Sequence, residues 1–154
     1  MKVYLYLCCL NRLTDDQTQR RIREEAEAVE RIFKRMRDGE VQWISSEALT
    51  DEITRNPHLE RRLENAALMT LTSEIIEINQ DIARRAGDLQ VAGYGAFDAL
   101  HLACAEAANV DALLTTDDGF VRKASRADGS PRVMVRNPLS WNQENFREQP
   151  RHND

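Results

Sequence analysis

The sequence predicts an α/β fold with three layers, in which a central, mainly parallel sheet lies between helices. Short apolar runs alternate along the chain with longer segments whose apolar residues recur at helical spacing. The runs are apolar throughout, as in strands that are covered on both faces. With 154 residues, 42% of them hydrophobic, the chain suits one core. We expect a domain over residues 1–140 and a polar tail over 141–154, frayed from residue 147.

The first predicted strand is Val3–Leu7, an apolar and aromatic run that should be central in the sheet. A long amphipathic helix follows, for which Asp15 and Asp16 are the expected N-caps and Gly39 the expected end. Its apolar residues are Ile22, Ala26, Val29, Ile32, Phe33 and Met36. Val41–Ile44 is the second predicted strand.

Three helices are predicted next. Ser45 and Ser46 are candidate hydroxyl caps for the first of them, and the second should begin at Pro57, since proline favours the first helical position. Leu68–Leu71 is either a helix end or a short strand. Ser73 is the expected cap of the third helix. Its apolar stripe would be Ile75, Ile76, Ile78, Ile82 and Ala86, with Gly87 as its end.

The remaining elements alternate again. Ala96–Ala108 is a helix rich in small residues, which can pack closely on the sheet. Ala112–Thr115 is a buried strand, and a short basic helix should follow the acidic turn after it. Val133–Val135 is the last strand, ended by Asn137 and Pro138. Right-handed crossovers between these strands would give the parallel sheet.

Charge and apolar pattern exclude several function classes. The net charge of −5 gives no general attraction for nucleic acid, so such a partner would need local patches or a metal ion. The arginine clusters are interleaved with glutamates, as on solvated helix faces. Val3–Leu10 is too short to span a membrane and is not a secretory signal. We therefore expect a cytoplasmic protein.

The three cysteines, Cys8, Cys9 and Cys104, include no CxxC pair, which argues against disulfides or a thiolate zinc site. We expect all three to be buried. His101 lies three residues before Cys104, and the two could share a metal ion. Without a third ligand, core packing is the better interpretation.

Three acids follow or precede predicted strands. Asp117 comes after Ala112–Thr115, Asp98 lies in the first turn of the preceding helix, and Glu52 lies on the helix after the second strand. In parallel sheets, ligands bind at the carboxyl ends of the strands. Carboxylates that converge there suggest Mg²⁺ or Mn²⁺, which prefer oxygen ligands. The alternative for each acid taken singly is a helix cap or turn residue.

The order of these segments resembles a known family. Phe97–Ala103, followed by Leu113–Phe120, is similar to the two C-terminal acidic motifs of the PIN-domain nucleases, which include the VapC-like toxin ribonucleases. Val3–Arg12 is similar to the family's first strand, and Ile44–Ile53 to its serine and glutamate segment. The resemblance covers residues 1–137.

The resemblance implies a metal-dependent endoribonuclease, the toxin of a toxin–antitoxin pair. Glu52, Asp98 and Asp117 would be the catalytic residues and the ligands of Mg²⁺ or Mn²⁺. Ser46 would support the Glu52 loop, and Thr115 would orient the site. The partners would be RNA, an antitoxin protein and a second copy of the chain, since the resemblance also implies a homodimer.

Tyr6 stands where the family has an aspartate. A phenol is neutral at pH 7, a poor ligand for Mg²⁺, and bulky where a hydrated ion should lie. We therefore expect a weakened or inactive nuclease. The alternative is a non-catalytic PIN module that binds RNA or protein. A phospho-accepting receiver domain is disfavoured, because the first strand ends in two cysteines rather than adjacent acids.

Two tryptophans near predicted chain edges, Trp43 and Trp141, are candidates for the dimer surface. The alternative is that both complete the core, because tryptophan is heavily buried on average.

Overall fold

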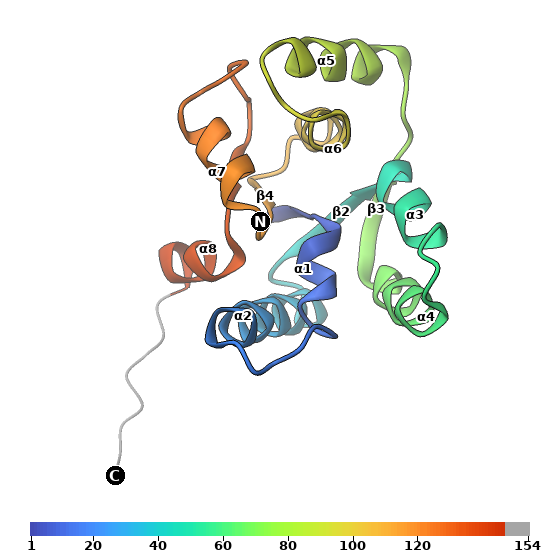
Figure 1. Ribbon diagram of the computed structural model, residues 1–154, viewed down its shortest axis with the longest axis vertical. Helices are drawn as coiled ribbons and strands as arrows, with labels where there is room; N and C mark the ends of the chain where they lie inside the picture. The colour runs from blue at the N-terminus through green and yellow to red at the C-terminus, as the bar shows by residue number, and fades with distance from the viewer. Residues whose placement is uncertain (147–154) are drawn as a thin grey trace.

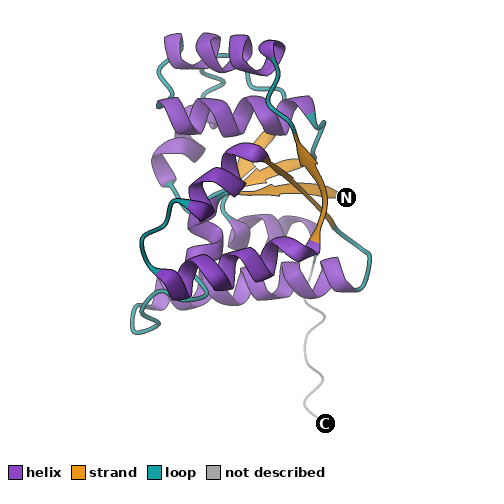
Figure 2. Cartoon of the chain, turned by 90° about the vertical axis from the view of Figure 1, so that its right-hand side faces the viewer, coloured by secondary structure: helices purple, strands orange, loops and turns teal. Residues whose placement is uncertain are grey.

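The computed structural model describes residues 1–146 and contains a five-stranded sheet with helices on both faces (Figures 1 and 2). The strand order is β3-β2-β1-β4-β5, and all four pairings are parallel. The strands are β1 (Lys2–Leu5), β2 (Gln42–Ser46), β3 (Thr72–Ile76), β4 (Ala112–Leu114) and β5 (Met134–Arg136). The predicted three-layer α/β class, with the first strand at its centre, is confirmed.

The helices divide between the two faces of the sheet. They are α1 (Leu7–Asn11), α2 (Arg20–Arg37), α3 (Glu47–Thr54), α4 (Leu59–Leu68), α5 (Gln80–Val91), α6 (Ala96–Ala107), α7 (Asp118–Ser125) and α8 (Pro138–Asn145). In Figure 1, α5, α6 and α7 lie on one side of the sheet and α1, α2 and α8 on the other. The central strands β1, β2 and β4 are therefore buried on both faces, whereas β3 at the edge of the sheet is largely exposed.

The alternation of side chains along β1 separates two apolar cores. Tyr4 packs into one core with residues of α5, α6 and α7. Val3 and Leu5 pack into the other with residues of α2, α3 and α8. Successive side chains of a strand point to opposite faces, so a continuous apolar run is what a central strand requires.

The predicted helix beginning at Ser73 is wrong, because residues 72–76 form strand β3, paired in parallel with β2. The isoleucines that suggested a helical stripe are β-branched residues, which also suit strands. The helix α5 begins only at Gln80, where the Asn79 side chain accepts a hydrogen bond from the Ile82 amide at 2.9 Å. Gly87 lies inside α5 rather than at its end.

Other predicted helix boundaries also differ. Asp15 and Asp16 are not N-caps, since α2 begins after Gln19. Asp15 instead pairs with Arg12 at 2.8 Å and with Arg61 at 3.0 Å. The helix predicted from Pro57 begins at Leu59, and residues 69–71 form a 3₁₀ turn.

A helix that the sequence analysis did not expect, α8, follows β5. Asn137 caps it by accepting a hydrogen bond from the Leu139 amide at 2.8 Å, and Pro138 occupies its first turn. Asn142 Nδ2 donates to the Ala28 carbonyl of α2 at 3.0 Å. The helix therefore continues past residue 141, the predicted start of the polar tail. The predicted frayed segment, 147–154, lies outside the described residues.

Trp43 and Trp141 are both buried, with 0% and 2% of their surface exposed, so they complete the core and are not surface candidates for a dimer. The three cysteines are free; Cys9 and Cys104 are buried, whereas Cys8 is only partly buried. In the part of the chain that the structure describes, no helix is long and apolar enough to cross a membrane.

Candidate active site

The candidate site lies at the carboxyl ends of β1, β2 and β4, which are neighbours in the sheet. Tyr6 follows β1 directly and is the residue before α1. Glu52 lies on α3 after β2, and Asp117 lies between β4 and α7. Asp98 comes from the first turn of α6. The topology therefore brings all four side chains to one edge of the sheet.

Tyr6 is bonded to one of the predicted metal ligands. Its hydroxyl donates a hydrogen bond to Asp98 Oδ1 at 2.9 Å. Its ring packs edge-on against His101, with centroids 4.5 Å apart, and against Phe120, with centroids 6.1 Å apart. Burial, together with the charge of Asp98, raises the pKa of Tyr6 well above its ordinary value. The phenol is therefore protonated and acts as a donor to the carboxylate.

Asp98 is also perturbed. Burial raises its pKa above the ordinary value, and the charge of Asp117 acts in the same direction. The hydrogen bond from Tyr6 opposes this shift, because it stabilises the ionised carboxylate. Asp98 and Asp117 both lie at this edge of the sheet, one in the first turn of α6 and the other before α7.

Glu52 is held by a chain of buried polar groups. Its Oε1 lies 2.7 Å from His101 Nε2, and His101 Nδ1 lies 2.5 Å from the Tyr4 hydroxyl. The Tyr4 hydroxyl lies 2.6 Å from Ser46 Oγ. Since an ionised carboxylate only accepts, the consistent direction is Ser46 to Tyr4 to His101 to Glu52. Ser46 is thus connected to Glu52 through two other side chains.

His101 has a role in the site that its residue type and position alone do not predict. Its side chain is fully buried, as core packing predicted, but its ring joins Glu52 to Tyr4. One signal was available, because His101 lies three residues after Asp98 and so shares its helix face. A buried polar ring in an otherwise apolar helix requires hydrogen-bond partners.

Asp117 is the N-cap of α7. Its Oδ1 accepts hydrogen bonds from the amides of Gly119, at 2.8 Å, and Phe120, at 3.2 Å. Its own amide donates to Thr115 Oγ1 at 3.2 Å. The cap that we considered as the alternative for this residue is therefore present, and Thr115 orients the backbone that carries Asp117.

The three acids do not fit a divalent ion in this arrangement. Among residues 1–146, no group of three His, Cys, Asp or Glu side chains is placed to hold a metal ion. Each of Glu52, Asp98 and Asp117 instead has a protein hydrogen-bond donor. The same finding leaves the possible His101 and Cys104 pair without a third ligand. No step of chemistry can be assigned to a metal ion here.

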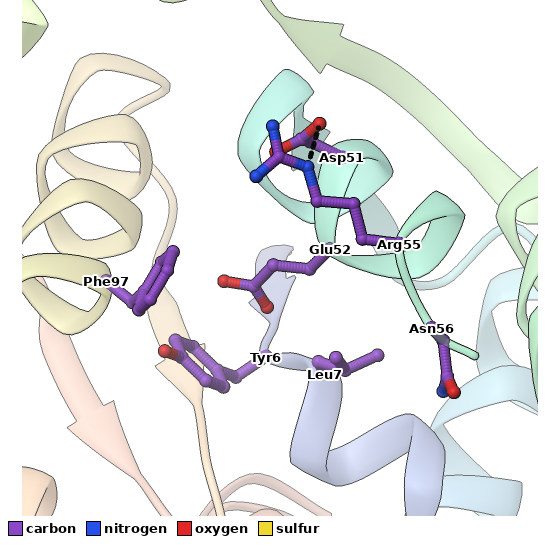
Figure 3. Close-up of a pocket in the computed structure, with 7 residues that line it drawn as sticks. All are labelled: Tyr6, Leu7, Asp51, Glu52, Arg55, Asn56 and Phe97. Carbon is purple, nitrogen blue, oxygen red and sulfur yellow. Dashed lines mark ion pairs between the residues drawn. The ribbon is translucent and has the colours of Figure 1, made fainter. Parts of the chain in front are cut away.

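A cavity of about 450 Å³ opens beside these groups (Figure 3). Its lining consists of Tyr6, Leu7, Asp51, Glu52, Arg55, Asn56 and Phe97. Figure 3 shows the Glu52 carboxylate pointing toward the rings of Tyr6 and Phe97. On the rim, Arg55 Nε pairs with Asp51 Oδ1 at 3.1 Å. The cavity therefore combines aromatic walls with a carboxylate.

The structure is therefore a parallel α/β fold in which Glu52, Asp98 and Asp117 lie with Tyr6 at the carboxyl edge of the sheet. The model of the PIN domain matches residues 12–125. The chain belongs to the PIN domain family, which confirms the resemblance seen in its motifs. The match begins after Tyr6, so the position where we expect the family's aspartate lies outside the matched segment.

A solved structure supports the same fold. The chain is similar to one in the crystal structure of VapBC2 from Rickettsia felis bound to a DNA fragment from its promoter. The TM-score is 0.55 at 14% sequence identity, covering 89% of this chain and 98% of that chain. At this identity the likeness concerns the fold. No curated protein matched the chain.

Proposed function

We propose that this chain is a PIN-domain protein of a toxin–antitoxin pair in which metal-dependent RNA cleavage is weakened or lost. The observation that carries the proposal is the hydrogen bond from Tyr6 to Asp98, at 2.9 Å. This hydrogen bond means that a neutral ring and a hydrogen-bond donor lie beside Asp98, which the family resemblance makes a ligand of Mg²⁺ or Mn²⁺. The solved relative, a VapBC2 assembly, supports an antitoxin as the partner.

The electrostatics of the site support impaired cleavage. Hydrolysis of a phosphodiester develops negative charge, which needs cations or donors nearby. The cavity is lined instead by the carboxylates of Asp51 and Glu52, and its lining cation, Arg55, is paired with Asp51. The positive charge of Lys123 acts to lower the pKa of Asp98. The Lys123 ammonium group donates a hydrogen bond to the Gly93 carbonyl at 2.5 Å. This environment disfavours a scissile phosphate.

The proposal is tested by restoring the family's carboxylate. Tyr6→Asp should bind Mg²⁺ or Mn²⁺ in calorimetric titration and cleave RNA about a hundredfold or more faster than the unchanged chain, since a few kcal/mol of transition-state stabilisation has this effect. Tyr6→Phe is the matched control, because it removes the hydrogen bond to Asp98 without adding a ligand, and should cleave no faster. Equal, robust cleavage by Tyr6→Asp and the unchanged chain would overturn the proposal.

The alternative is a non-catalytic module that binds RNA or an antitoxin, and the same hydrogen bond favours it. The two functions differ in their response to Tyr6→Asp. A weakened nuclease regains cleavage, whereas a scaffold that has lost other requirements for cleavage binds the metal ion but leaves RNA intact. The Glu52, Asp98 and Asp117 side chains are all present, which favours the weakened nuclease.

Homodimerisation belongs to the same proposal, as the family resemblance implies it. Since both tryptophans are buried, the surface must lie elsewhere. On α4, Leu59 and Leu63 are 56% and 60% exposed and lie four residues apart, on one helix face. A monomer by light scattering at high concentration would argue against a dimer.

A further inference from the structure

We infer that the cavity between Tyr6, Phe97 and Glu52 binds a guanine base of single-stranded RNA without a metal ion. The inference rests on the proposed function in one respect, because a metal ion in this place would occupy the same carboxylates. It assigns the cavity a ligand of a defined chemical class, a planar ring that presents two neighbouring N–H donors.

The first support is the exposed aromatic ring at the mouth of the cavity. Phe97 is 66% exposed, although large apolar side chains are usually buried. It precedes Asp98 in the first turn of α6, and Figure 3 shows its ring beside that of Tyr6, toward the Glu52 carboxylate. Proteins that bind single strands stack bases on such aromatic side chains. Phe97 and Tyr6 therefore offer surfaces for the faces of a base.

The second support is the hydrogen-bonding character of Glu52. The ionised carboxylate is an acceptor with about four lone-pair positions, and His101 takes one of them, on Oε1. On its Watson–Crick edge guanine presents two adjacent donors, N1–H and N2–H, which match two carboxylate oxygens. Adenine and cytosine each place a ring-nitrogen acceptor next to a single amino donor. That acceptor would face a carboxylate oxygen, which is also an acceptor, and the contact would be unfavourable. Glu52 therefore selects guanine.

The third support is the size of the cavity. At about 450 Å³ it lies within the range of sites for small organic ligands. An arginine guanidinium also presents two N–H donors in a plane, but it offers a smaller flat surface to the rings of Tyr6 and Phe97 than a bicyclic base does. The apolar walls formed by Tyr6, Leu7 and Phe97 suit the faces of a bicyclic base.

The test is a titration of the unchanged chain with guanosine, inosine and adenosine in buffer containing EDTA, followed by nuclear magnetic resonance. Guanosine should bind at least about tenfold more tightly than inosine, which lacks the N2 donor. It should exceed adenosine by the same factor, since a pair of hydrogen bonds to one base edge gives discrimination of this order. Glu52→Gln carries one donor and one acceptor, so it should lose guanosine and gain adenosine. Equal binding of all three nucleosides would overturn the inference.

Phe97→Ala should weaken guanosine binding about tenfold, whereas Phe97→Trp, which keeps a stacking surface, should retain it. Val91→Ala is the matched control, because Val91 is 90% exposed on α5, does not line the cavity, and should leave binding unchanged. Binding of L-arginine methyl ester in place of guanosine would overturn the inference and indicate a protein side chain as the occupant.

The two proposals fail in different ways. If the unchanged chain binds neither guanosine nor Mg²⁺, only the proposal of a guanine site is overturned. Binding of Mg²⁺ by the unchanged chain in a separate calorimetric titration without EDTA, with RNA cleavage equal to that of Tyr6→Asp, overturns the proposed function.

Discussion

The two sides of the site hold their carboxylates differently. On the side of β2, Glu52 ends a chain of hydrogen bonds through His101, Tyr4 and Ser46, three side chains that are fully buried. On the side of β4, Asp98 and Asp117 are bonded near the surface, to the Tyr6 hydroxyl and to the amides that begin α7. Water can replace a lost partner of Asp117, which is exposed, but not a lost partner of the fully buried side chains on the first side. We therefore expect substitutions to be better tolerated on the β4 side than on the β2 side.

The largest expected effect tests the buried side. His101→Ala removes a fully buried ring that packs against Tyr4 and Tyr6 and leaves the Tyr4 hydroxyl without the acceptor that the ring provides. The loss of packing and of two hydrogen bonds should lower the free energy of unfolding by about 3 kcal/mol or more. Urea unfolding followed by circular dichroism measures this.

Tyr4→Phe sharpens the same comparison, because it keeps the ring and removes only the hydroxyl between Ser46 and His101. A smaller loss, about 1–3 kcal/mol, is expected from the two buried groups left unpaired. If both variants unfolded at the urea concentration of the unchanged chain, the buried chain would not stabilise the fold.

An intermediate effect is expected on the β4 side from Asp117→Ala. This change removes the acceptor for the amides of Gly119 and Phe120 and should lower the free energy of unfolding by about 1 kcal/mol, the usual effect of losing an N-cap. Asp117→Asn keeps a capping oxygen without the charge and should recover most of this loss. A loss as large as that of His101→Ala would erase the distinction between the two sides.

The smallest expected effect is the pH dependence contributed by Asp98. Burial is the main cause that raises its pKa above the ordinary value of about 3.9. Between the ordinary and the raised value, the folded chain retains a proton that the unfolded chain has released. Stability therefore falls as the pH rises through this window, and the contribution is constant above it.

Asp98→Asn should remove this part of the pH dependence, because an amide does not titrate in this range. The measurement compares urea midpoints of the two chains from just below the ordinary carboxyl range up to neutrality. A contribution of Asp98 that increases stability with rising pH would mean that the Tyr6 hydrogen bond outweighs burial.

Much of the fold could be predicted, because its central elements are specified locally. The apolar run of β1, the small residues of α6 and the run before Asp117 each have one structural interpretation. The segment that contains β3 cannot be predicted in the same way, because isoleucines at positions 75, 76 and 78 fit both a strand and a helical stripe. There the pairing of β3 with β2, which is not local, decides the structure.

The site could be predicted only in outline. Position along the sheet placed Glu52, Asp98 and Asp117 at one edge, since this follows from strand order. The bonds that these side chains make did not follow, because they join distant residues: Tyr6 and Asp98 are 92 residues apart, and Glu52 and His101 are 49 apart. No local pattern shows which donor a carboxylate will meet in the folded chain.

The helix α8 has a practical consequence for work on shortened versions of the chain. Ending the polypeptide at residue 140, where its composition turns polar, would divide α8 and remove both the indole of Trp141 and the amide of Asn142 that bonds to α2. The apolar core that contains Trp141 and residues of α2 would then be exposed to solvent, and the shortened chain should aggregate. A truncated version intended for binding assays should therefore keep residues up to 146.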